Sequence, residues 1–185
     1  MRREQGRPGD RINVVGTTGS GKTTVARAIA DRLGMEHIEL DALFWKPDWG
    51  ETPDEEFLPS VDEATRGDRW VLDGNYSRTR PIVWPRVDTV VWLDYSFARV
   101  FGQLLRRTIR RAITKEPMWG GCVENPRLAF FSRESILLWC LQTYWKRRRN
   151  YPAILNKPEH RHLTVIRLRN RRQTTQWLRN LRQAG

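Results

Sequence analysis

The sequence predicts an α/β fold in which five parallel strands form a sheet with helices on both faces. Two observations support it. Short apolar runs alternate with longer segments of helical periodicity along the 185 residues, and polar or glycine residues follow each apolar run. Since ligands of such sheets bind beyond the carboxyl ends of the strands, those polar residues are the candidates for chemistry.

Each element follows from a local pattern. The predicted strands span 11–15, 37–40, 70–72, 89–93 and 162–168. The predicted helices span 22–33 with Gly34 as the stop, 54 to about 66, Ser96 as N-cap to about 112, a long segment that Pro152 limits after Tyr151, and a last helix carrying Trp177, Leu178 and Leu181. Neither an internal repeat nor a low-complexity linker interrupts them, so residues 1–185 are expected to form one domain.

The loop after the first strand carries the strongest motif. Residues 16–23 (GTTGSGKT) satisfy the phosphate-binding pattern G-x-x-x-x-G-K-[ST], between a strand and a helix as the motif requires. Lys22 brings a positive charge to the β- and γ-phosphates, and the Thr23 hydroxyl suits magnesium. We expect ATP and Mg²⁺ to bind here. The predicted nucleotide-binding residues are Gly16, Thr17, Thr18, Gly19, Ser20, Gly21, Lys22, Thr23 and Thr24.

Composition limits the class of protein. The chain is 39% hydrophobic without an apolar run of membrane-spanning length, so no membrane partner is expected. Two cysteines, Cys122 and Cys140, favour reduced thiols and a cytoplasmic location. The net charge of +12 indicates either nucleic-acid binding or many arginines around phosphates. Because charge runs are usually solvated helix faces, nucleic acid stays possible but is not favoured.

Several segments together resemble the adenylate-kinase-like P-loop kinases: the phosphate-binding loop, 71–76 (VLDGNY), 92–94 (WLD) and the arginine-rich helix after it. With 39–45 (ELDALFW), they look most like the small proteins labelled DNA topology modulation proteins. The resemblance implies the three-layer P-loop NTPase fold with strand order 2-3-1-4-5. It also implies a substrate-binding segment at about 43–66 and a lid at about 114–126.

The resemblance also assigns roles. Asp73 matches the aspartate that supports magnesium through water, and Arg107, with Arg111 one turn further, would reach the transferring phosphoryl group. Three departures put AMP in doubt as the acceptor. Thr23 stands where adenylate kinases have glycine, Ser77 stands where an arginine holds the monophosphate, and Gln103 stands where an arginine is expected. Arg78 and Arg80 lie near enough in the sequence to replace that arginine.

Asp41 follows the second strand, where kinases similar to shikimate kinase place an aspartate against the acceptor hydroxyl. A capping or turn role for Asp41 remains the alternative. The predicted catalytic residues are Lys22, Asp41, Asp73, Arg107 and Arg111, with Thr23 and Asp73 at the metal. Three hypotheses stay open: a nucleotide-kinase-like phosphotransferase acting on a small acceptor, a nucleic-acid-binding or regulatory ATPase, and a kinase of a non-nucleotide metabolite.

Overall fold

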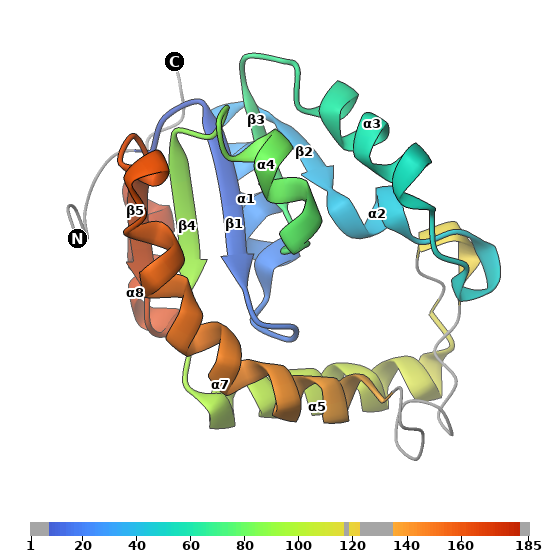
Figure 1. The fold of residues 1–185 in the computed structure, drawn as a ribbon. Helices are drawn as coiled ribbons and strands as arrows, with labels where there is room; N and C mark the ends of the chain where they lie inside the picture. Colours follow the sequence, from blue (N-terminus) through green and yellow to red (C-terminus); the bar gives the residue numbers. More distant parts are fainter. Residues whose placement is uncertain (1–7, 117–118, 123–134, 182–185) are drawn as a thin grey trace.

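A computed structural model of the protein describes residues 8–116, 119–122 and 135–181. Five parallel strands form one sheet in the order β2-β3-β1-β4-β5 (Figure 1), which confirms the predicted fold class and strand order. The strands are β1 (Arg11–Gly16), β2 (Glu36–Glu39), β3 (Trp70–Asp73), β4 (Thr89–Leu93) and β5 (Thr164–Leu168). Because β1 is the central strand, the loop that follows it lies in the middle of the carboxyl edge.

Helices cover both faces of this sheet. They are α1 (Lys22–Leu33), α2 (Leu40–Phe44), α3 (Asp54–Ala64), α4 (Arg80–Val83), α5 (Phe97–Thr114), α7 (Ile136–Leu155) and α8 (Arg171–Asn180). Short 3₁₀ turns lie at η1 (Pro47–Trp49), η2 (Ser77–Thr79), η3 (Trp119–Gly121) and η4 (Pro158–His160). Figure 1 shows α5 and α7 side by side, as an arm below the carboxyl edge of the sheet.

Two hydrophobic cores result from the alternation of side chains along the strands. Ile12 and Val14 of β1 enter the core shared with α1, α5, α8 and the first half of α7. Val15 enters the core on the opposite face, shared with α2, α3, α4 and the last turns of α7. The helix α7 therefore contributes to both cores, which fixes it across the carboxyl edge next to the phosphate-binding loop.

Some predicted boundaries match and others are wrong. Helix α1 and strand β4 have the predicted bounds, and Gly34 ends α1 with φ 61° and an N–H bond to the carbonyl of Ala30. Leu40, predicted as strand, begins α2 instead. Leu40 and Phe44 lie four apart and both pack into the second core, so burial favours a helical turn here. The helices α2 and α4 were not predicted.

Pro152 does not limit α7, which continues to Leu155. A proline inside a helix removes one backbone hydrogen bond and crowds the preceding turn. Tyr151 and Leu155 are both buried in the second core, and their burial stabilises the helical path past the proline. The remaining differences are small: α3 stops at Ala64, α5 extends to Thr114, β5 begins at Thr164, and β1 and β3 each include one further residue.

Candidate active site

The loop between β1 and α1 has a backbone shape that glycine alone adopts easily. Gly19 and Gly21 have φ angles of 78° and 87°, in the left-handed region. A Cβ atom on Gly16 would lie 2.7 Å from the Ser20 hydroxyl oxygen and 3.0 Å from the Leu93 carbonyl oxygen. The three glycines of the motif therefore allow a close turn that leaves its N–H groups available to a polyphosphate.

Lys22, the first residue of α1, is where the predicted site residues meet. Burial lowers the pKa of its ammonium group, and the carboxylates of Asp41 and Asp73 act in the opposite direction. The guanidinium groups of Arg147 and Arg107 add to the lowering. Two carboxylates and two guanidinium groups, from four different elements, thus contribute to the pKa of Lys22. Four of the five predicted catalytic residues come together here.

Asp73 ends β3 and is 1% exposed. Its Oδ2 lies 3.0 Å from His37 Nε2, and His37 Nδ1 lies 3.7 Å from Glu39 Oε1. Strand pairing opposes Glu39 and Asp73 across the β2–β3 register. Magnesium prefers oxygen ligands and keeps several waters, so the Asp73 carboxylate and the Thr23 hydroxyl next to Lys22 fit that ion. The sequence did not reveal the contact of His37 with Asp73, because 36 residues separate them.

Asp41 lies in the first turn of α2, and Tyr76 follows β3. The Tyr76 hydroxyl donates a hydrogen bond of 2.6 Å to Asp41 Oδ1. Burial raises the pKa of Tyr76 far above its usual range, and the Asp41 carboxylate raises it further, so the phenol keeps its proton and remains the donor. This bond fixes one carboxylate oxygen and leaves Oδ2 for another donor.

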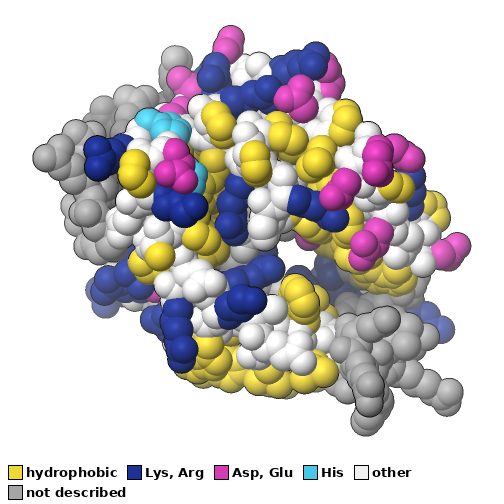
Figure 2. All heavy atoms as spheres, viewed as in Figure 1, with side chains coloured by type: hydrophobic (Ala, Val, Ile, Leu, Met, Phe, Trp, Pro, Cys, Tyr) yellow, Lys and Arg dark blue, Asp and Glu magenta, His cyan; other side chains and the backbone are white. Residues whose placement is uncertain are grey.

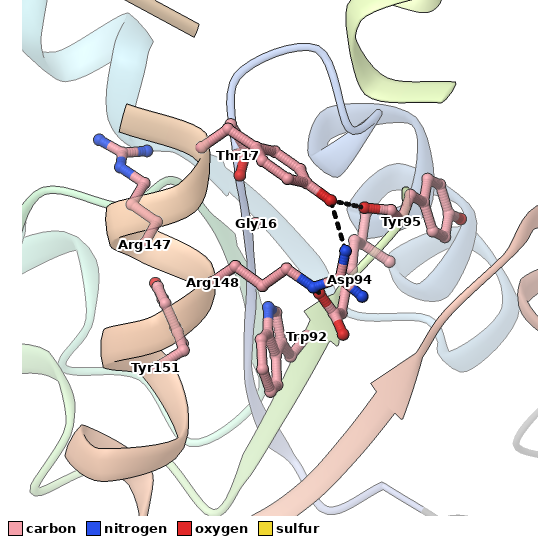
Figure 3. A pocket seen from close by; sticks show the side chains of 10 residues that line it. Gly16, Thr17, Trp92, Asp94, Tyr95, Arg147, Arg148 and Tyr151 are labelled. Carbon is pink, nitrogen blue, oxygen red and sulfur yellow. Dashed lines mark hydrogen bonds and ion pairs between the residues drawn. The ribbon is translucent and has the colours of Figure 1, made fainter. Parts of the chain in front are cut away.

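Two adjacent arginines of α7 have different surroundings (Figure 3). Arg148 points toward Asp94, with Nε 3.1 Å from Oδ1, whereas Arg147 points away from it. Both arginines line a small cavity next to Gly16 and Thr17 of the phosphate-binding loop. Burial lowers the pKa of Arg147, and no carboxylate among the described residues forms an ion pair with it. The expectation that charge runs lie on solvated helix faces does not hold for Arg147, which was not among the predicted site residues.

A further cation, Arg80 of α4, lies near Arg147. The Arg80 charge acts on Arg147, and its Nη2 donates a 3.4 Å hydrogen bond to Asn75 Oδ1, which also accepts from the Tyr151 hydroxyl. The Asn75 Nδ2 atom is buried without a hydrogen-bond partner in the described part of the chain. Arg80, Arg147 and this amide therefore present donors that a ligand with negative charge would satisfy.

Arg78, the other residue considered as a substitute for the missing arginine, is engaged elsewhere. Its Nη1 lies 2.8 Å from Asp54 Oδ1, and its guanidinium stacks 4.7 Å from the Phe44 ring centroid. Ser77, the first residue of the same turn η2, is exposed. Of the two candidates, Arg80 is thus the one that remains near the cleft.

The helical phase of α5 separates its four central arginines. Arg106 and Arg110 are exposed, and Arg110 pairs with Glu116 at 2.7 Å. Arg107 and Arg111 are half-buried, and each has a buried Nε atom. Arg107 acts on Lys22, whereas no such interaction places Arg111 beside it.

Gln103, on the same helix, donates a 3.0 Å hydrogen bond from Nε2 to the carbonyl of Gly19. The residue that stands in place of an expected arginine thus supports the phosphate-binding loop.

The substrate-binding segment expected at 43–66 includes the end of α2, η1 and α3. Of the lid expected at 114–126, residues 117–118 and 123–126 lie outside the described residues. The described part contacts the substrate segment through Cys122, whose thiol lies 3.3 Å from the Lys46 carbonyl oxygen and 3.2 Å from the Trp49 backbone nitrogen. It also contacts β2, since Trp119 Nε1 donates a 3.0 Å hydrogen bond to Glu39 Oε2. Figure 2 shows a hollow in the surface between the substrate segment and the α5–α7 arm.

Comparisons with known proteins show what the chain is similar to. No protein-family model matches the chain. A protein from Thermococcus onnurineus named "Putative adenylate kinase" is 38% identical over 77 residues, which cover 38% of this chain and 43% of that protein. A shikimate kinase from Synechococcus is 28% identical over 123 residues, covering 59% and 64%. The chain thus spans less than half of the first relative's length.

Solved structures extend the likeness over nearly the whole chain. A shikimate kinase from Bacteroides thetaiotaomicron matches with a TM-score of 0.54 and 18% identity, covering 93% of this chain and 96% of that one. At this identity the likeness shows the fold alone, which is that of the P-loop kinases.

Proposed function

We propose that the protein is an ATP- and magnesium-dependent kinase that phosphorylates a small acceptor. The observation that carries the proposal is the convergence on Lys22 of two carboxylates and two guanidinium groups beside a glycine-rich loop. A nucleotide-binding protein without transfer chemistry needs the loop and the lysine. Such a protein does not need a further carboxylate, here Asp41, held by a hydrogen bond from Tyr76.

Phosphoryl transfer requires positioning and neutralisation of charge more than covalent help. Lys22 and Arg107 would neutralise charge on the transferring group, in a cleft where burial strengthens such interactions. Magnesium, held by the Thr23 hydroxyl and through water by Asp73, would supply further positive charge to the β- and γ-phosphates. His37 fixes the orientation of the Asp73 carboxylate through the 3.0 Å contact.

Asp41 supports an alcohol as the attacking group. Its Oδ2 would accept the proton of the acceptor hydroxyl as the hydroxyl oxygen attacks the γ-phosphorus. The new oxygen–phosphorus bond forms while the bond to the β–γ bridging oxygen breaks, and ADP leaves with that electron pair. The Tyr76 hydrogen bond keeps Oδ1 occupied and so orients Oδ2. A phosphate acceptor needs no base, and a carboxylate would repel it.

Arg147 and Arg80 support an acceptor that also carries an anionic group. They lie near each other with like charges and without a carboxylate partner for Arg147 in the described chain. A carboxylate or phosphate on the acceptor would satisfy both guanidinium groups and the free Asn75 amide. The best-supported substrate class is therefore a small hydroxylated metabolite with one anionic group.

A nucleoside monophosphate is the second candidate acceptor. The sequence similarity to proteins named "Putative adenylate kinase" favours it. Ser77 and the ion pair of Arg78 with Asp54 speak against it, because Ser77 replaces the arginine that holds the monophosphate in adenylate kinases and Arg78 is engaged elsewhere.

An acceptor screen separates these possibilities. ADP formation is measured with ATP and Mg²⁺ in the presence of hydroxylated carboxylic acids, sugar phosphates, nucleoside monophosphates or no acceptor, with Lys22→Ala as the inactive control. Stimulation by a hydroxylated anion supports the proposal, and stimulation by monophosphates alone supports the second candidate. Equal rates with and without every acceptor would leave an ATPase and refute the kinase assignment.

A further inference from the structure

The outer face of the α5–α7 arm carries a continuous group of exposed apolar side chains. Figure 2 shows hydrophobic side chains along the lower edge of the molecule, over these two helices. We call the group the apolar band. It consists of Ile109, Ile113, Leu138, Trp139, Leu141 and Trp145, whose exposures range from 36% to 75%.

The band is one surface because the two helices pack against each other. Ile109 and Ile113 lie four apart on α5, and Leu138, Leu141 and Trp145 follow helical spacing on α7. The two helices contact each other, and at the start of α5 the ring of Phe97 stacks 6.0 Å from the ring of Trp145.

Exposed apolar side chains are otherwise rare on this protein. Within the described residues, the other large hydrophobic side chain of comparable exposure is Trp49, at 37%. Single exposed apolar residues need no explanation, but a contiguous patch on a soluble domain marks a contact surface. The band therefore points to a partner that covers it.

Charge restricts what that partner can be. The helices α5 and α7, 18 and 20 residues long, contain nine Lys and Arg residues and no Asp or Glu. The exposed cations on them are Arg99, Arg106, Arg110, Lys146 and Arg149. A second copy that docked band to band would bring two such cationic rims together, which is unfavourable. An anionic partner would be attracted.

The aliphatic residues distinguish between anionic partners. Nucleic acids are bound by cations on phosphates and by aromatic rings on bases. The band also contains aliphatic side chains, which provide neither a positive charge nor an aromatic ring: Ile109, Ile113 and Leu141. A phosphate backbone would not bury them away from water. An anionic bilayer surface matches all three features: acyl chains for the aliphatic residues, the headgroup level for tryptophans, and lipid phosphates for the cations.

We propose that the α5–α7 face binds the surface of an anionic lipid bilayer, with the apolar band entering the boundary between headgroups and acyl chains. None of the helices in the described ranges is both long and apolar enough to cross a membrane, so the binding is peripheral. Arg107 and Arg147 act on Lys22 on the inner side of the same helices, so docking would leave the cleft open. The proposal does not depend on the kinase assignment.

Cosedimentation with vesicles tests it. The full chain is mixed with phosphatidylcholine vesicles or with vesicles containing equal parts phosphatidylcholine and phosphatidylglycerol, at 0.15 M salt. Wild type is expected to bind the anionic vesicles at least about tenfold more tightly, since each basic residue near the surface adds attraction. A double variant, Ile113→Glu with Leu141→Glu, is expected to lose binding about tenfold or more, because it removes apolar contact and adds repulsion.

The matched control, Ala153→Glu with Gln176→Glu, makes the same charge change at exposed positions outside the band. It is expected to bind anionic vesicles nearly as wild type does. Circular dichroism and thermal midpoints verify folding, and the milder variant Trp139→Ala provides a second reading if the double variant unfolds.

Three results would overturn the proposal. The first is equal affinity of wild type for both vesicle types, and the second is equal binding by the band variant and its control. The third is that the band variant abolishes self-association or single-stranded DNA binding while leaving vesicle binding unchanged. That result would assign the band to another partner.

Discussion

The proposed donor and acceptor sides of the cleft are built in different ways. On the donor side, one loop between β1 and α1 supplies backbone N–H groups and Lys22, all within eight residues of sequence. On the acceptor side, Asp41, Tyr76, Arg80 and Arg147 each come from a different part of the chain. The donor site is therefore a local property, whereas the acceptor site depends on how four segments pack. Changes on the donor side should weaken every reaction, and changes on the acceptor side should alter substrate preference.

The largest effect is expected from Lys22→Ala. Removal of the ammonium group leaves developing charge on the transferring phosphoryl group without its nearest cation, which should lower kcat by about 10³-fold. Steady-state kinetics with saturating ATP and acceptor measure it. A variant that keeps its thermal midpoint yet loses less than tenfold in kcat would contradict the role of Lys22.

Asp73→Asn is expected to lower kcat about 10- to 100-fold and to raise the magnesium concentration needed for half-maximal rate, since it weakens an outer ligand of the metal. The exposed Asp68 provides the control, because Asp68→Asn makes the same chemical change away from the cleft. A magnesium titration of both variants measures the effect. Identical titration curves would exclude Asp73 from the metal site.

Arg147→Met should raise the acceptor KM about 10- to 100-fold, because charge-assisted hydrogen bonds contribute about 1.5–3 kcal/mol. The affinity for ATP should change much less. Arg149→Met, two residues further along α7 and exposed, is the matched control. If both variants showed the same kinetics, the inward position of Arg147 would have no functional consequence.

Gly19→Ala tests whether ATP binding depends on the backbone conformation of the phosphate-binding loop. Its φ of 78° and a Cβ 2.7 Å from Leu104 Cβ strain the loop by about 1–2 kcal/mol, so ATP affinity should fall roughly tenfold. The KM for the acceptor should remain unchanged. Calorimetric titration measures the affinity for ATP, and steady-state kinetics measure the KM for the acceptor. A change in the acceptor KM alone would argue against separate donor and acceptor sides.

An effect of similar size to that of Gly19→Ala is expected from Tyr76→Phe. The variant removes the 2.6 Å bond to Asp41 but keeps the ring packed on Phe44 and Phe57. Loss of one hydrogen bond to a charged group should lower kcat/KM by about tenfold. Asp41→Asn should lower it further, and equal effects of the two variants would indicate that Asp41 acts only through Tyr76.

The sequence predicted what is local. The loop motif and the bounds of α1 and β4 follow from contiguous patterns. The strand order came from the family resemblance, and the structure confirms it. The contact of Asp41 with Tyr76 spans 35 residues, and no local pattern encodes it. In the basic run 146–149, the sequence alone does not show which side chain faces inward. Lys146 and Arg149 are exposed while Arg147 faces the loop, a distinction that the packing of α7 decides.

At Pro152 the local prediction was wrong, because α7 continues past this residue. A strong local rule predicted the end of the helix, and the burial of Tyr151 and Leu155 outweighed it.

Transfer of labelled γ-phosphate from ATP tests the central claim most directly. The protein is incubated with labelled ATP, magnesium and a mixture of small hydroxylated carboxylic acids and sugar phosphates, with nucleoside monophosphates in parallel, and the products are separated. The account predicts label in a hydroxylated anionic acceptor, lost with Lys22→Ala and reduced with Asp41→Asn. Label found only in inorganic phosphate would contradict it.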